Sequence, residues 1–432
     1  MSLIFFVIVL IAFVIAGARE IAWVAPAVGQ GDVKSPMQMM ADAMLSSADA
    51  SVTLAIGLVG VMALFLGLMK VAEKGGLLVV IARLVRPLMV RLFPEVPADH
   101  PAIGAMILNL SANVLGLGNA ATPFGIRAME ELDKLNPAKG TASNAMVLFL
   151  AINTASVTVL PTGVIALRAA AGSVDPAGII PTTLFATVIA TAVAILVAKL
   201  GQRWWPITVT VAAGEEAPRA PVVSDEAVVI EDVKPYPEWA SYLTLLGIVG
   251  LIPLTVVFGR TISPWIVPGL MVLLLGFGLL RRVNIYEAFV EGARDGFTVA
   301  LRIIPYLVAI LVAVGMFRAS GALDMMIGPL AKVTAPLGLP AEALTMTLLR
   351  MLSGSGAFGY LASMLNDPAI GPDSYTGYLV STIQGSTETT FYVLAVYFGA
   401  VGVKRIRHAL VAGLSADVAG VIASAVAVWL MI

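Results

Sequence analysis

Apolar runs long enough to cross a lipid bilayer recur along this chain of 432 residues. A helix of about 20 apolar residues spans the hydrocarbon core of a membrane and pairs its own backbone groups there. Only 12% of the residues are charged, about half the share in a soluble domain, and the mean hydropathy is +0.95. The sequence therefore predicts an all-α polytopic membrane protein in contact with lipid. We expect spans near residues 3–17, 50–69, 142–168, 177–200, 239–259, 263–280, 297–317, 376–400 and 408–431.

Charge and residue types exclude several function classes. The formal net charge of −1 gives no electrostatic basis for binding nucleic acid. The chain has no cysteine, which excludes disulfides, thiolate metal sites and a cysteine nucleophile. No Ser/His pair, HExxH motif or pair of carboxylates stands out as a catalytic or metal-binding group. We therefore expect a protein that is not an enzyme and that has no cofactor.

One long polar interval divides the chain. Residues 201–238 combine charged side chains with several prolines, a composition typical of a solvated linker. We therefore expect two membrane domains, 1–200 and 239–432, joined by a cytoplasmic linker at 201–238.

The two domains follow the same plan. An amphipathic segment, 70–94 or 318–340, precedes a Gly-rich hairpin at 101–131 or 348–365. A long helix with a polar middle and one more spanning helix follow in each domain. Each repeat is thus predicted to contain an interfacial helix, a re-entrant hairpin, a broken transmembrane helix and a further span. Paired interruptions of this kind indicate a transporter binding site near the middle of the membrane.

Basic residues predict opposite orientations for the two repeats. The second amphipathic segment has only Arg318 and Lys332, whereas the first has five basic residues. By the positive-inside tendency, the first segment lies on the cytoplasmic face and the second on the outer face. The number of predicted spans between them leads to the same arrangement, an inverted-topology repeat. The five basic residues are Lys70, Lys74, Arg83, Arg86 and Arg91.

The polar middles of the two long helices can be aligned residue by residue. FLAINTASVTVLP, 149–161, matches VSTIQGSTETTFY, 380–392, which places Asn153 opposite Gln384. Glu388 lies opposite Val157, so only the second copy is ionisable. Backbone groups that are freed where such helices break can bind a polar solute or an ion without burying a full charge.

The hairpin tips and the polar middles together form the predicted binding site. Ser and Thr on membrane helices often bond only their own backbone, which is the ordinary structural alternative. Glu388 is different, because an ionisable side chain at membrane depth usually faces a cavity or a partner. Its alternative role is a structural pair with Arg302 or Arg350, and Asp417 is a weaker case of the same kind. The predicted site consists of Asn119, Asn153, Thr154, Ser156, Thr158, Ser353, Ser355, Gln384, Ser386, Thr387, Glu388 and Thr389.

Several long runs carry a family resemblance. LNLSANVLGLGNAATPFGIRAMEEL, 108–132, resembles the spore maturation protein A family. LLRMLSGSGAFG, 348–359, and GSTETTFYVLAVYFGAVGVK, 385–404, resemble the spore maturation protein B family. The chain is similar to a fusion of the two over nearly its whole length. Both are nucleoside-recognition, or gate-domain, proteins, which are similar in repeat plan to concentrative nucleoside transporters. This resemblance implies the bacterial inner (plasma) membrane, a central site between hairpins and broken helices, and a homo-oligomer.

The repeat plan and the resemblance favour one function and leave one alternative. We expect a transporter that moves a small polar solute by alternating access, with Na⁺ or a proton as the coupling ion. The alternative is a non-transporting membrane factor in spore or cell-envelope maturation. The identity of the solute is not encoded in any motif of the chain.

Overall fold

The computed structural model describes residues 2–24, 34–116, 121–207 and 236–431. Within these ranges every regular element is a helix. The predicted all-α class is therefore confirmed for the described part of the chain.

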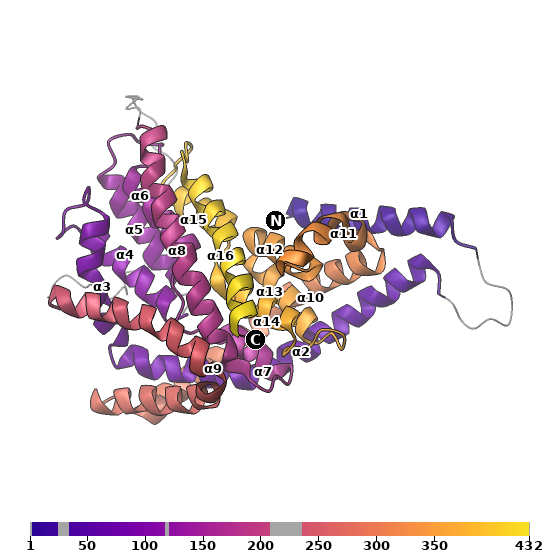
Figure 1. Cartoon of the computed structure of the whole chain (residues 1–432), viewed down its shortest axis with the longest axis horizontal. Coiled ribbons are helices and arrows are strands. Elements are labelled where there is room, and N and C mark those ends of the chain that lie inside the picture. Colours follow the sequence, from indigo (N-terminus) through magenta and orange to yellow (C-terminus); the bar gives the residue numbers. More distant parts are fainter. Residues whose placement is uncertain (1, 25–33, 117–120, 208–235, 432) are drawn as a thin grey trace.

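Helices α2–α8 and α10–α16 repeat one order of elements (Figure 1). The first part of the chain contains α1 (Ser2–Ile21), α2 (Pro36–Lys74), α3 (Leu77–Leu92), α4 (Pro101–Val114), α5 (Ala121–Lys134), α6 (Asn144–Thr154), α7 (Thr162–Ala170), the 3₁₀ turn η2 (Pro176–Gly178) and α8 (Ile179–Trp204). The second contains α9 (Glu238–Leu280), α10 (Ile285–Ala319), α11 (Ala322–Thr334), η3 (Ala335–Leu337), α12 (Ala341–Leu352), α13 (Gly354–Leu365), α14 (Tyr375–Ser386), α15 (Thr390–Ala400) and α16 (Ala409–Met431). Both long helices with polar middles are broken, as predicted. The orientation of each set in a membrane stays a prediction.

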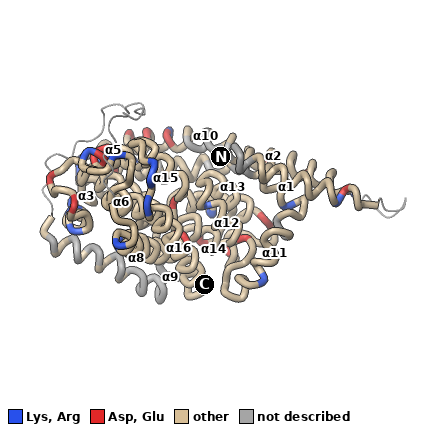
Figure 2. The backbone as a smooth tube through the Cα atoms, turned by 90° about the horizontal axis from the view of Figure 1, so that it is seen from above, with Lys and Arg blue, Asp and Glu red and all other residues tan. Residues whose placement is uncertain are grey.

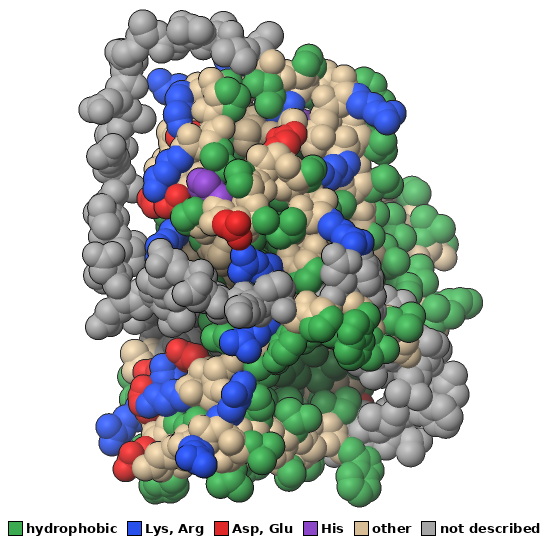
Figure 3. All heavy atoms as spheres, turned by 90° about the vertical axis from the view of Figure 1, so that its left-hand side faces the viewer, with side chains coloured by type: hydrophobic (Ala, Val, Ile, Leu, Met, Phe, Trp, Pro, Cys, Tyr) green, Lys and Arg blue, Asp and Glu red, His purple; other side chains and the backbone are tan. Residues whose placement is uncertain are grey.

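Helices α8 and α16 have the length and surface of membrane spans. Among the described residues, Pro176–Trp204 and Ala409–Met431 are long and apolar enough to cross a bilayer, and the bent helix α2 is a third candidate. Exposed apolar side chains recur at helical spacing on one face of α16, and Figure 3 shows further apolar side chains on the outside of the molecule. Those on α16 are Val411, Val418, Ile422, Val426 and Trp429.

One continuous helix replaces the two spans predicted near 239–259 and 263–280. Helix α9 runs from Glu238 to Leu280. Gly259 and Pro264 border the predicted gap, but the helix continues through both. The prediction of two separate helices is wrong here, and the predicted number of membrane crossings relied on it.

Helices α2 and α10 pack against each other in an antiparallel pair (Figures 1 and 2). Small residues allow the close approach: a Cβ at Gly296 would lie 2.7 Å from the Ala63 backbone, and one at Gly315 would lie 2.4 Å from the Ser47 hydroxyl oxygen. Small residues commonly line helix contacts in membranes for this reason. The pair connects the two repeats along most of the molecule.

Serine N-caps begin both broken helices. The Ser143 hydroxyl accepts the Met146 N–H at 3.2 Å, and the Ser374 hydroxyl accepts the Gly377 N–H at 2.9 Å. These bonds satisfy N–H groups that the first turn of a helix leaves unpaired. The chain thus fixes where α6 and α14 start, and both helices then run toward their breaks.

Buried Arg168 ties α7 to the loop that precedes α14. Its guanidinium donates to the Pro372 carbonyl oxygen at 2.6 Å and to an Asp373 carboxylate oxygen at 3.1 Å. It also lies 4.0 Å from the centre of the Tyr378 ring, a cation–π contact. The far end of the first broken helix is therefore held by the start of the second.

His408, just before α16, makes the stability of this fold depend on pH. Its Nε2 lies 3.0 Å from the Ala198 carbonyl oxygen, whereas its buried Nδ1 has no partner among the described residues. Burial lowers the pKa of His408 from its ordinary value of 6.5. Since the unfolded chain then binds the proton more readily, stability should fall as the pH drops below about 6.5. We expect His408→Gln to weaken this loss in thermal unfolding between about pH 7.5 and pH 5.5. If the unfolding temperatures of both proteins fell equally with pH, His408 would not be the cause of the pH dependence.

Candidate functional site

The first break, residues 155–161, separates α6 from α7 and lies against the α4–α5 hairpin. The Val159 N–H donates to the Val114 carbonyl oxygen at 3.0 Å. Gly116, just beyond α4, has a left-handed backbone with φ +70°, and a Cβ there would lie 2.1 Å from the Leu160 carbonyl oxygen. Only glycine permits this approach of two backbones. The hairpin and the first broken helix are therefore in direct contact.

The second break, residues 387–389, separates α14 from α15 and contacts the α12–α13 hairpin. Ser353 joins α12 to α13, and its hydroxyl accepts the Gly356 N–H at 3.0 Å. A Cβ on the adjacent Gly354 would lie 2.9 Å from the Thr389 hydroxyl oxygen. Each hairpin thus touches the break of its own half.

The two breaks also meet each other. The Glu388 N–H donates to the Thr154 carbonyl oxygen at 2.8 Å. Thr154 ends α6, so its carbonyl is one of those that a helix C-terminus leaves without an internal partner. The next carbonyl, that of Ala155, accepts from the Thr191 hydroxyl of α8. We call the region around the Thr154–Glu388 contact the junction.

One ion pair lies at the junction. Arg350 of α12 donates to a Glu388 carboxylate oxygen at 3.2 Å and to the Thr389 hydroxyl at 3.4 Å. The Arg350 side chain is only 8% exposed, whereas that of Glu388 is 44% exposed. The pair with Arg350 that the sequence left as an alternative is therefore formed. It leaves the carboxylate accessible while the cation is buried.

Beside the junction, an amide network holds Asn153. Its Oδ1 accepts from Asn113 Nδ2 at 3.1 Å, and the Tyr397 hydroxyl lies 3.5 Å away. Asn109 Nδ2 donates to that hydroxyl at 3.1 Å. Sequence reasoning missed Asn109, Asn113 and Tyr397. The four-residue spacing of the two asparagines, which places them on one face of α4, was the available signal.

Three of the other predicted hydroxyls bond their own backbone, the ordinary alternative. The donor–acceptor pairs are Thr154 to Ala151 at 2.8 Å, Ser386 to Ile383 at 3.0 Å and Thr158 to Ser156 at 3.3 Å. Ser156, Thr387 and Thr389 are buried, whereas Ser355 is exposed at the hairpin tip. Gln384 is buried, and its Oε1 has no partner in the described part of the chain. Asn119 lies outside the described residues.

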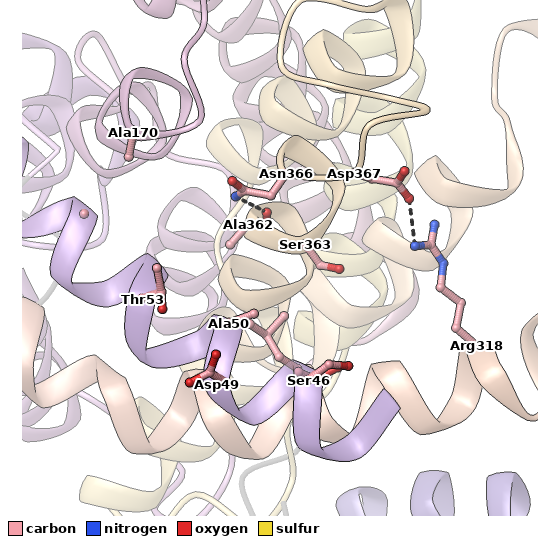
Figure 4. Close-up of a pocket in the computed structure, with 13 residues that line it drawn as sticks. Ser46, Asp49, Ala50, Thr53, Ala170, Arg318, Ala362, Ser363, Asn366 and Asp367 are labelled. Atoms are coloured by element: carbon pink, nitrogen blue, oxygen red, sulfur yellow. Dashed lines mark hydrogen bonds and ion pairs between the residues drawn. The ribbon is translucent and has the colours of Figure 1, made fainter. Parts of the chain in front are cut away.

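A cavity of about 770 Å³ lies between α2, α10 and α13 (Figure 4). Arg318 donates to an Asp367 carboxylate oxygen at 2.9 Å on its wall, and Asp49 and Asn366 also line it. None of the predicted site residues lines this cavity. Helix α13 has 12 residues and is about 18 Å long. Its C-terminal end lines the cavity, and Gly354 at its N-terminal end contacts the second break. One hairpin helix therefore contacts both places.

The junction offers groups that can form hydrogen bonds. Its polar groups are amides, hydroxyls, backbone groups and one ion pair. Across 2–24, 34–116, 121–207 and 236–431, no three His, Cys, Asp or Glu side chains lie close enough together to hold a metal ion. Such groups can hydrogen-bond a polar solute and discriminate by its shape and charge.

A family model described as Gate, nucleoside recognition, matches the chain in two regions, residues 55–171 and 300–404. Each region contains one hairpin and one broken helix. The match therefore falls twice on the same set of elements.

Curated relatives each match part of the chain. Spore maturation protein B of Bacillus subtilis is 45% identical over 168 residues, which cover 39% of this chain and 91% of that protein. Spore maturation protein A of the same organism is 45% identical over 161 residues, 37% of this chain and 82% of that protein. Inner membrane protein YjiG of Escherichia coli is 36% identical over 90 residues, 21% of this chain and 59% of that protein.

Solved structures of CNTnw variants align with the whole chain at low identity. For a doubly substituted variant in an outward-facing state, the TM-score is 0.45 and the identity is 12%, over 98% of this chain and 99% of that one. A variant in an intermediate state gives a TM-score of 0.39.

Proposed function

Because the chain belongs to the Gate family of nucleoside-recognition proteins, we propose that it is a multi-pass transporter that moves a small polar solute across the bacterial inner membrane. The observation that carries this proposal is the junction, where the Glu388 N–H meets the Thr154 carbonyl oxygen at 2.8 Å. This contact pairs two backbone groups that the breaks leave free, and it joins interrupted helices from different halves of the chain. It lies where a solute could contact both halves.

Among the described residues of the proposed binding site, Ser355 is exposed and Glu388 and Thr158 are partly exposed. The Glu388 carboxylate can accept hydrogen bonds from a solute, and Arg350 behind it prevents a net charge at the junction. Gln384 offers a carbonyl oxygen that no described group uses. Asn153 contributes indirectly, because its Oδ1 is already bonded to Asn113. Hydroxyl- and amine-bearing solutes, including nucleosides, match this set of acceptors.

In this proposal the hairpins act as gates. Residues 1–200 and 239–432 form two gate domains of inverted topology, joined by a cytoplasmic linker at 201–238, most of which lies outside the described residues. The α12–α13 hairpin lines the cavity at one end and contacts the second break at the other, so its displacement would change both. Na⁺ or a proton accompanies the solute as the coupling ion.

Glu388→Gln is expected to reduce solute uptake about 10- to 100-fold, because a hydrogen bond to a charged group contributes about 1.5–3 kcal/mol. The measurement is uptake of radiolabelled nucleosides, nucleobases and amino acids into proteoliposomes that contain the full chain. Glu342→Gln is the matched control. It also removes a carboxylate, but from the first turn of α12, at the opposite end of that helix from Arg350. Equal uptake by Glu388→Gln and the unsubstituted protein would exclude a role of the carboxylate in transport.

The names of the two Bacillus relatives favour a second candidate, a non-transporting factor in spore or cell-envelope maturation. Such a factor would bind wall-synthesis proteins and need no solute at the junction. It predicts no uptake of any solute tested, partners recovered by crosslinking, and maturation that survives neutral substitutions at Glu388 and Gln384.

A further inference from the structure

A second acidic side chain, Asp417, lies near the junction and is used by neither the ion pair nor the amide network. It is in the middle of α16 and is 1% exposed. Its Oδ2 accepts from the Thr390 hydroxyl at 2.6 Å, and its Oδ1 is buried with no partner among the described residues. A buried carboxylate oxygen without a donor is rare in folded proteins, because its loss of hydration is not compensated.

The face of α16 that carries Asp417 touches both breaks. A Cβ on Gly413, one turn earlier, would lie 2.8 Å from the Thr390 methyl and 3.7 Å from the Thr154 hydroxyl oxygen. A Cβ on Gly420, three residues later, would lie 2.8 Å from the Thr387 methyl. Residues spaced by three or four share one helix face. Asp417 therefore lies where the first and second breaks pack on α16.

Among the described residues, no base forms an ion pair with the Asp417 carboxylate. Arg350, the charged group that faces it from α12, is already paired with Glu388. Helix α6 and the Trp265–Leu280 part of α9 have no ionisable residue. Helix α8 packs on α16 and has its basic residues, Lys199 and Arg203, near its C-terminal end, where Gly201 contacts His408. The remaining titratable groups on the packed helices are the tyrosines Tyr375, Tyr378, Tyr392 and Tyr397.

We propose that Asp417 is the proton-binding site of this protein and that its protonation is coupled to the position of α15. This inference rests on the proposed transport function. A proton from the aqueous phase binds Oδ1, which makes the carboxyl neutral while Oδ2 keeps its bond from Thr390. Release to the opposite phase restores the carboxylate. Since Thr390 is the first residue of α15, a displacement of α15 breaks that bond and exposes Asp417 to solvent.

Infrared spectroscopy of the full chain in lipid nanodiscs tests the proton directly. The carbonyl stretch of a protonated carboxylic acid should be present at neutral pH and absent from Asp417→Asn. Asp367→Asn is the control, because this carboxylate is paired with Arg318 and should not contribute to the band. Thermal unfolding confirms that each variant is folded. Identical spectra for Asp417→Asn and the unsubstituted protein would overturn the proposal.

Two further results separate this inference from its premise. A Na⁺-dependent thermal shift that Asp417→Asn abolishes, with no acid band, would make Asp417 a cation site and overturn the proton proposal. An Asp417 band in a protein that takes up no solute would refute transport while leaving the protonation of Asp417 in place. With uptake established, coupling requires that Asp417→Asn remove its dependence on a pH gradient.

Discussion

Replacing Arg350 by glutamine should abolish uptake and destabilise the protein, because it leaves Glu388 at the junction without a cation. Breaking a buried pair from one side costs about 3–5 kcal/mol, and the partial exposure of Glu388 reduces this to about 1–3 kcal/mol. Arg350 also bonds Thr389, so the second break loses two contacts. The measurements are thermal unfolding in detergent and uptake into proteoliposomes.

The double variant Arg350→Gln with Glu388→Gln distinguishes an uncompensated charge from lost packing. Its stability should recover most of the loss, since no charge remains unpaired, whereas uptake should stay low. Arg318→Gln is the matched control, because it removes the base of a similar pair, with Asp367, at the cavity. If Arg318→Gln and Arg350→Gln were equally active, the pair at the junction would have no special role.

The sequence was sufficient to predict that both long helices are broken and that a helical hairpin precedes each, although the second hairpin begins at Ala341 rather than at 348. Polar residues in an apolar helix, such as those around Asn153 and Glu388, are conspicuous because polar side chains are costly to place in lipid. Ser143 and Ser374, the N-caps of α6 and α14, are local signals of the same kind, although no N-cap was predicted at either position. Features that depend on nearby residues were therefore accessible without a structure.

Partners from distant segments could not be predicted in the same way. Tyr397 lies near Asn153 although 244 residues separate them. Which side chains meet in the interior depends on how each helix is rotated about its axis and shifted along it. The residue type alone determines neither. Asp417 illustrates the consequence: the sequence marks it as a buried acid, but only the packing of α16 on both breaks shows what it contacts. The long helix α9 was missed for another reason, because polar residues near 260, with Gly259 and Pro264 beside them, indicate a break where the helix continues.

Gly116→Ala should be the most damaging small substitution at the first break. Its Cβ would lie 2.1 Å from the Leu160 carbonyl oxygen, a backbone atom that can move only if the hairpin or the first break moves. The left-handed backbone adds about 1 kcal/mol and the overpacking about 1–3 kcal/mol, so we expect a loss of about 2–4 kcal/mol. Uptake should fall with it, since the hairpin is displaced from the break.

Gly140→Ala isolates the close approach from the backbone strain. Gly140 has nearly the same φ, +74°, but a Cβ there meets nothing within 4 Å in the described part of the chain. It should cost only the strain of about 1 kcal/mol and leave uptake unchanged. The difference between the two variants in thermal unfolding then measures how firmly the hairpin is held against the first break. A gate that opens during transport requires this contact to be weak enough to separate, so equal losses from both variants would mean that the hairpin already yields to a single methyl group.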